Sequence, residues 1–206
     1  MLIETGQFAG LTSNGYGAIL ADPPWQWTPW SDKGLGNRAT SNHYETRPLQ
    51  AIIDLPVGQL AAPNCVLFMW ITWPQLFDAQ KVIDAWGFTY KTCAFSWMKA
   101  HAGQIELFRN DIDPFVGLGY WTRANSEVCL LATRGRPKRL NADVRQGIIE
   151  PRREHSRKPD CVAERIERLV AGPYIELFAR TTRRGWDCWG NQTDMFPAFD
   201  WAAADS

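Results

Sequence analysis

Alternation between apolar strand-like runs and helix-like segments constrains the fold of this chain more than any other feature. Residues 16–20, 65–72 and 88–99 have the length and apolar content of buried strands. Residues 74–87 begin near a Pro and end at a Gly, as a helix does, and residues 48–61 predict another helix. Strands and helices in this order favour parallel strands joined by right-handed crossovers. We therefore expect an α/β fold with a mostly parallel central sheet and helices on both faces.

The second half of the chain continues the same pattern. Residues 128–133 predict a strand, and 159–172 predict a helix with one apolar face and a terminal Gly. Residues 174–180 and 188–192 predict the last strand and a turn at a strand end. A chain of 206 residues with no repeat and no linker suits one domain over 1–206.

The composition is that of a globular protein, with 45% hydrophobic and 21% charged residues. No apolar stretch approaches a membrane span, and the first residues lack the features of an export signal. We therefore expect no membrane association and a cytoplasmic location. The five cysteines are more than twenty residues apart, which predicts buried reduced thiols rather than a metal site or disulfides.

A local basic segment is hidden in a formal net charge of zero. Residues 134–158 hold nine Lys or Arg against three Asp or Glu. Such a segment is a candidate contact for a polyanion, and we expect Arg136, Lys138 and Arg139 to pass close to the mouth of the site and follow a nucleic-acid backbone. The alternative is a solvated loop that keeps the protein soluble.

The stretch "ILADPPWQW" ends the first predicted strand on Asp22, Pro23, Pro24 and Trp25. Because proline has no N–H, this turn offers hydrogen-bond acceptors and almost no donors. Acceptors suit a ligand group that only donates, such as the exocyclic amine of adenine, while Trp25 could stack on the base. A strand followed by a structural proline turn is the alternative.

The chain also resembles a known family in the order of its motifs. "DPPW" resembles the catalytic motif of adenine-N(6) methyltransferases related to the messenger-RNA N(6)-adenosine methyltransferase, including compact bacterial and phage members. Similar motifs follow as "YETRPLQAI", "LFMW", "WMK", "GYWTRANSEVCLLATRG", "HSRKPD", "ELFAR" and "GNQ". The resemblance covers nearly the whole chain. It implies a Rossmann-like, S-adenosylmethionine-dependent methyltransferase fold.

The resemblance also implies which residues bind the cofactor S-adenosylmethionine. By this likeness Lys158 reaches the methionine carboxylate, Glu176 and Arg180 border the ribose, and Asn191 and Gln192 bind the ribose or adenine. No metal is implied.

On the substrate side, the resemblance places Tyr44 near the target base, and we add Glu127, at the start of "EVCLL", as a candidate substrate residue. The chain departs from the family after "ELFAR", where "TTRRGWD" replaces a Pro-His-Asn continuation. We therefore carry no ribose contact over to Thr182 or Arg183.

Together these patterns predict methyl transfer from S-adenosylmethionine to the N(6) amine of adenine in a nucleic acid, DNA rather than RNA. RNA remains an alternative substrate, and a catalytically silent nucleic-acid-binding paralogue is an alternative function. Cytosine-N(4) methylation is disfavoured because that class begins its motif with Ser rather than Asp. The loops at 26–47 and 100–126 are expected to provide any sequence preference, and the protein is expected to be a monomer or a homodimer.

Overall fold

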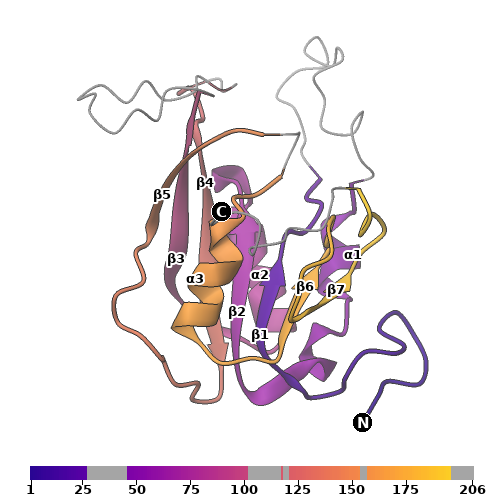
Figure 1. Ribbon diagram of the computed structural model, residues 1–206. Helices are drawn as coiled ribbons and strands as arrows, with labels where there is room; N and C mark the ends of the chain where they lie inside the picture. The colour runs from indigo at the N-terminus through magenta and orange to yellow at the C-terminus, as the bar shows by residue number, and fades with distance from the viewer. Residues whose placement is uncertain (27–45, 102–116, 118–120, 154–156, 196–206) are drawn as a thin grey trace.

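The computed structural model describes residues 1–26, 46–101, 117, 121–153 and 157–195 (Figure 1). In these residues seven strands form one sheet in the order β5-β3-β4-β2-β1-β6-β7. The strands are β1 (Tyr16–Ala21), β2 (Ala61–Ile71), β3 (Thr89–Ala100), β4 (Ser126–Arg134), β5 (Gly147–Pro151), β6 (Tyr174–Leu177) and β7 (Trp186–Trp189). The helices are α1 (Leu49–Ile53), α2 (Leu76–Ala85) and α3 (Cys161–Leu169), with 3-10 turns η3 (Val57–Gln59) and η4 (Trp73–Gln75).

Six of the seven strands run in the same direction. Strand β1 pairs in parallel with β2 and β6, β6 with β7, and β3 with β5, whereas β4 is antiparallel to both of its neighbours. The crossover through α2 places β3 two positions away from β2 in the sheet, and β4 lies between them. The expectation of a mostly parallel α/β sheet is confirmed, and the carboxyl ends of six strands share one edge.

Helices cover both faces of the sheet, as expected. One core lies under α1 and α2, where Ile52, Val82 and Ile83 are fully buried, and the other lies under α3, where Val162 and Ile166 are buried. Figure 1 shows α3 on the near face and α2 on the far face. No helix in the described parts of the chain is long and apolar enough to cross a membrane.

Two elements differ from the sequence prediction. The helix expected over 48–61 is only five residues long, because Pro56 prevents its continuation, and β2 already begins at Ala61. Strand β5 lies inside the basic segment, where no strand was predicted. It is an edge strand with Ile148 buried and Ile149 exposed, so it has too short an apolar pattern to stand out.

The five cysteines all lie on predicted strand or helix segments and are free thiols. Cys65 and Cys129 are fully buried, and the other three are half-buried.

The close packing of β1 against the turn before β6 can be tested at Gly17. Its N–H donates to the Pro173 carbonyl at 2.9 Å. A Cβ at this position would lie 2.6 Å from the Ala171 carbonyl oxygen and 2.9 Å from that of Gly172. Because backbone would have to shift, we expect Gly17→Ala to lower the free energy of unfolding by about 1–3 kcal/mol.

Gly147 in β5 is the matched control, because a Cβ there meets nothing within 4 Å. We expect Gly147→Ala to change the free energy of unfolding by less than about 1 kcal/mol. Urea denaturation of both variants measures the difference, and equal losses in the two would contradict a close approach at Gly17.

Candidate active site

Asp22 lies at the carboxyl edge of the sheet, directly after β1. Ala21 pairs with Met69 of β2 on one side and with Leu177 of β6 on the other. The Asp22 N–H also donates to the Leu177 carbonyl at 3.4 Å. Asp22 is therefore held between two parallel strands, at the edge where open α/β sheets bind ligands.

A chain of four alternating charges begins at Asp22. Lys158 Nζ lies 2.7 Å from Asp22 Oδ2 and 3.3 Å from Glu127 Oε2, and Glu127 also pairs with Lys99. The four side chains are between 14% and 20% exposed. They come from the end of β1, the segment before α3, and the adjoining ends of β4 and β3. The fold thus brings together two acids and two lysines that are distant in sequence.

These four charged side chains stabilise one another against the energetic cost of burial. Burial lowers the pKa of Lys158, but the carboxylates of Asp22 and Glu127 outweigh it and raise that pKa above its ordinary value. For Glu127 burial acts to raise the pKa, and Lys158 and Lys99 outweigh it and hold the pKa below its ordinary value. Lys158 and Glu127 are therefore both charged at neutral pH.

Sequence reasoning placed Lys158 and Glu127 in the site but did not pair them. Lys158 was assigned to the cofactor carboxylate, and the structure places its ammonium on Asp22. Lys99 was missed as a site residue, although it is the lysine of the "WMK" motif. The motif could have identified Lys99 as a site residue, but no local sequence pattern connects Lys99 to Glu127.

The turn after Asp22 is fixed by backbone hydrogen bonds. The Pro23 carbonyl accepts from the Trp25 N–H at 2.8 Å, and the Pro24 carbonyl accepts from the Arg47 N–H at 2.9 Å. The Trp25 indole N–H donates to the Trp70 carbonyl at 3.0 Å. Both prolyl carbonyls thus already accept one hydrogen bond, and each keeps a second lone pair for a ligand. Trp25 is half-buried against the core.

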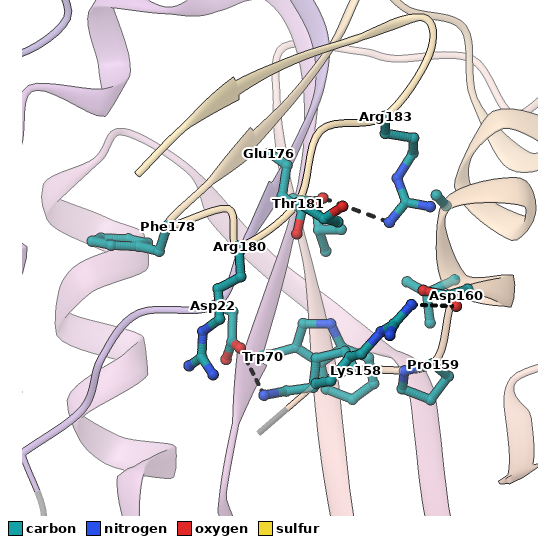
Figure 2. Close-up of a pocket in the computed structure, with 14 residues that line it drawn as sticks. Asp22, Trp70, Lys158, Pro159, Asp160, Glu176, Phe178, Arg180, Thr181 and Arg183 are labelled. Carbon is teal, nitrogen blue, oxygen red and sulfur yellow. Dashed lines mark hydrogen bonds and ion pairs between the residues drawn. The ribbon is translucent and has the colours of Figure 1, made fainter. Parts of the chain in front are cut away.

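Two cavities meet at Asp22, and Phe178 and Arg180 line both of them. The first lies between β1, β6 and the start of α3 (Figure 2) and is rich in charge. Its charged lining residues are Asp22, Arg157, Lys158, Asp160, Glu176, Arg180 and Arg183. The second cavity is lined by Asp22, Pro24, Arg47, Phe178, Ala179, Arg180, Trp189, Gly190, Asn191 and Gln192. The five predicted cofactor residues therefore all line one or both cavities.

Close packing after β6 and β7 brings the "GNQ" segment to the second cavity. The Ala179 N–H donates to the Trp189 carbonyl at 3.0 Å. A Cβ on Gly190 would lie 2.5 Å from the Ala179 carbonyl oxygen, so only glycine allows this approach. Phe178, with a φ of 61°, turns the chain at the end of β6.

Glu176 and Arg183 form a buried and loose pair in the first cavity. Arg183 Nη2 lies 3.7 Å from Glu176 Oε2, which is beyond hydrogen-bond distance. Glu176 Oε2 and the Nε and Nη1 atoms of Arg183 are buried without a hydrogen-bond partner. Burial raises the pKa of Glu176 to about 7; Arg183 opposes this rise and Asp22 adds to it. Sequence reasoning left Arg183 out of the site.

The expectation that Arg136, Lys138 and Arg139 lie at the mouth of the site is wrong. Because β4 is antiparallel, its last residue, Arg134, pairs with Cys65 at the beginning of β2. The Arg136 N–H donates to an Asn64 side chain, and Arg139 pairs with Val170 after α3. All three cations therefore lie at the amino edge of the sheet, opposite Asp22. Strand β5 then returns the chain, so only the end of the basic segment reaches the site (Figure 1).

Tyr44 lies outside the described residues, as do most of the two long loops at 26–47 and 100–126. The role of Tyr44 near the base stays a prediction.

Comparison with known proteins identifies the family. The MT-A70 family matches residues 16–192. The chain is 33% identical to the type II methyltransferase M.MunI of a Mycoplasma species, over 89% of this chain and 80% of the relative. It is 30% identical to the N(6)-adenine-specific methyltransferase METTL4 of Homo sapiens, over 92% of this chain and 40% of the relative. It is 26% identical to the N6-methyladenosine RNA methyltransferase MTA1 of Pyricularia oryzae, over 98% of this chain and 54% of the relative.

The matched residues begin at β1 and end with "GNQ", so they include Asp22 and both cavities. The chain belongs to the MT-A70 family of S-adenosylmethionine-dependent adenine-N(6) methyltransferases.

Proposed function

We propose that this chain transfers a methyl group from S-adenosylmethionine to the N(6) amine of adenine in DNA. The observation that carries the proposal is Asp22, a carboxylate at the carboxyl edge of the sheet that lines both cavities and is followed by Pro23, Pro24 and Trp25. DNA is proposed over RNA because the type II methyltransferase aligns over 80% of its own length at 33% identity. The RNA methyltransferase aligns over 54% of its length at 26% identity.

The two cavities fit the two halves of S-adenosylmethionine. The methionine half is a zwitterion, and the first cavity holds unpaired buried polar atoms on Glu176 and Arg183. The nucleoside half has a diol and a heterocycle, and the second cavity offers the amides of Asn191 and Gln192 beside the Trp189 ring. Bound there, S-adenosylmethionine supplies a methyl group that is electrophilic because it is attached to a sulfonium.

Asp22 holds and activates the amine of the target adenine. Lys158 binds Oδ2 of its carboxylate, so the other oxygen is the one assigned to accept an amine N–H. Accepting this bond turns the nitrogen lone pair away from the ring and makes the amine a better nucleophile. The nitrogen carries a positive charge after it is alkylated and until it loses a proton, and an adjacent carboxylate stabilises that charge.

Lys158 fixes the position of the Asp22 carboxylate before substrate arrives. A preoriented charge needs no reorganisation during the reaction, which is where electrostatic catalysis gains most. The intact Asp22-Pro23-Pro24-Trp25 motif beside both cavities favours catalysis over the silent paralogue.

Replacement of Asp22 tests the proposed reaction. We expect Asp22→Ala to lower methyl transfer by at least about 100-fold, which is roughly 2.7 kcal/mol of barrier. Binding of S-adenosylmethionine should stay within a few-fold, because the variant keeps all five residues assigned to contact the cofactor, which lie between Lys158 and Gln192. Mass spectrometry of nucleosides from DNA and RNA of cells that express each variant measures N(6)-methyladenine in the two polymers.

The matched control is Asp78→Ala, which removes an exposed acid that pairs with Lys81 on α2. It should leave methylation unchanged. An Asp22 variant with more than about a tenth of wild-type activity would exclude the proposed role. Methylation confined to RNA would overturn the choice of DNA, and tight DNA binding by a wild-type protein without activity would favour the silent paralogue.

Replacement of Asn191 tests the nucleoside half of the cofactor site. We expect Asn191→Ala to weaken S-adenosylmethionine binding by about threefold to tenfold, the usual size for one lost hydrogen bond. Isothermal titration calorimetry measures this change. Asn141→Ala is the control, because Asn141 binds the Arg168 carbonyl away from both cavities. Equal affinities of the two variants would require the nucleoside to bind elsewhere.

Neutralising cations at the two edges of the sheet tests where DNA binds. Arg123 and Arg152 are exposed at the carboxyl edge, near the ends of β4 and β5, whereas Arg136 and Lys138 are exposed at the amino edge. We expect Arg123→Gln with Arg152→Gln to weaken DNA binding for all sequences. The log–log salt slope should fall by up to about two units if each cation meets one phosphate.

The control is Arg136→Gln with Lys138→Gln, which should leave the salt slope unchanged. Fluorescence anisotropy at several salt concentrations gives both slopes. A larger effect of the control pair would place the nucleic acid at the edge opposite Asp22, against this proposal.

A further inference from the structure

We infer that Arg47 binds a DNA phosphate next to the target adenine and so positions that nucleotide beside Asp22. This inference rests on the proposed function and deepens it, because it assigns one residue to the DNA backbone at the reacting base. Arg47 is among neither the cofactor residues nor the substrate residues that the sequence predicts.

The backbone of Arg47 is fixed beside the proline turn. Because Pro48 follows it, Arg47 favours an extended conformation. It forms a parallel β-bridge with Trp25, and its N–H donates to the Pro24 carbonyl at 2.9 Å. Its side chain is half-buried and lines the second cavity together with Asp22. Arg47 therefore borders the same cavity as the carboxylate that receives the adenine amine.

The positive charge of Arg47 is available to a ligand. Among the described residues, no acidic side chain forms an ion pair with it. Its guanidinium lies 6.0 Å from the centroid of the Trp189 ring, and an aromatic face stabilises a cation without using up its N–H donors. Asp22, the acid that lines this cavity, is already paired with Lys158 at 2.7 Å. The half-buried guanidinium thus keeps its donors for an anion.

S-adenosylmethionine does not supply that anion. In the proposed arrangement the second cavity holds its nucleoside half, which is uncharged, and the adjoining sulfonium is positive. Its carboxylate belongs to the methionine half, and the described residues that line the first cavity do not include Arg47. The other substrate, DNA, carries one negative charge per nucleotide. The phosphates that flank the target adenine enter the site with the base, so they are the anions that reach Arg47.

An arginine suits this role because of its geometry. A guanidinium donates two parallel N–H bonds to the oxygens of a phosphate, so it fixes orientation as well as distance. Contacts of this kind set the register of the polymer and carry no sequence information. With the backbone held by Arg47, the N(6) amine meets the Asp22 carboxylate in one orientation, which lowers the entropic cost of reaching the reactive geometry.

A first test compares DNA binding with cofactor binding. Arg47→Gln removes the charge but keeps the backbone N–H that binds Pro24. We expect it to weaken DNA binding by about 10–100-fold, the size of one lost charge-assisted hydrogen bond. The log–log salt slope should fall by about one unit. Fluorescence anisotropy at several salt concentrations measures both.

The affinity of Arg47→Gln for S-adenosylmethionine should stay within about twofold of wild type, because the cofactor makes no ionic contact with Arg47. Isothermal titration calorimetry measures it. The matched control is Arg136→Gln, which removes an exposed arginine at the amino edge of the sheet and should change neither affinity.

A second test locates the phosphate. The probe is an oligonucleotide centred on an adenine that wild-type protein methylates, with a neutral methylphosphonate on the 5′ side or the 3′ side of that adenine. We expect one of the two replacements to weaken binding by wild-type protein about as much as Arg47→Gln weakens binding of unmodified DNA. Arg47→Gln should bind that probe and unmodified DNA within about twofold of each other, because the contact is already lost.

The conservative variant separates charge from geometry. Arg47→Lys keeps the charge but loses the paired donors, so it should keep the salt slope of wild type and lose part of the affinity for DNA.

The inference is overturned if Arg47→Gln keeps the wild-type affinity for DNA, or if each methylphosphonate weakens its binding as much as that of wild type. A loss confined to S-adenosylmethionine would assign Arg47 to the cofactor and would also overturn it. Where the glutamine variant does not fold, wild-type DNA affinity in Arg47→Lys has the same consequence. Wild-type protein that methylates no DNA would instead contradict the proposed function itself, so the two failures are distinguishable.

Discussion

The contact between Lys158 and Asp22 is the interaction on which the rest of the site depends. It joins residues 136 positions apart, so it forms only when the end of β1 and the segment before α3 meet over the completed sheet. An exposed pair of this kind would stabilise the protein little. Here both side chains are at most 20% exposed, and removing one partner leaves a charge that is mostly out of water. Glu127 and Lys99 extend the pair, so that each of these four charged side chains has a neighbour of opposite charge.

The antiparallel direction of β4 explains two features of the molecule. It brings Glu127 close to Lys158, and it keeps most of the basic segment 134–158 away from Asp22. Val128 of β4 pairs with Ile71 at the carboxyl end of β2, which brings Glu127 to the edge that holds Asp22. The other end of β4 then lies about 20 Å away, six residues along β2, and takes Arg136 and Lys138 with it. A parallel strand in this position would have exchanged the two ends. Because β4 is antiparallel, the basic segment 134–158 begins at the amino edge of the sheet, and only its last residues lie near the site.

Sequence patterns predicted the parts of the molecule that depend on local information. Strands β1 and β2 were found because their apolar runs are continuous, and β3 was found because it follows the Gly that ends a predicted helix. Asp22 was found because its turn has an unusual composition. Strand β5 has a single fully buried side chain, Ile148, in a polar stretch and gave no such signal. The partner of Lys158 could not be predicted, because that pairing depends on long-range packing. Arg183 resembled any surface arginine in the sequence, and only the fold reveals that it is buried with unpaired donors.

The hydrogen bonds at the proline turn change how selectivity for an amine can arise. Since the Pro23 and Pro24 carbonyls already accept from Trp25 and Arg47, attraction of the amine falls mainly to the Asp22 carboxylate. A base with a carbonyl oxygen in the same place would face three acceptors and no proline N–H. One nearby donor that could rescue such a base is Lys158, and its ammonium is directed to Asp22 and Glu127. Exclusion of carbonyl-bearing bases therefore depends in part on Lys158 keeping its contacts with Asp22 and Glu127.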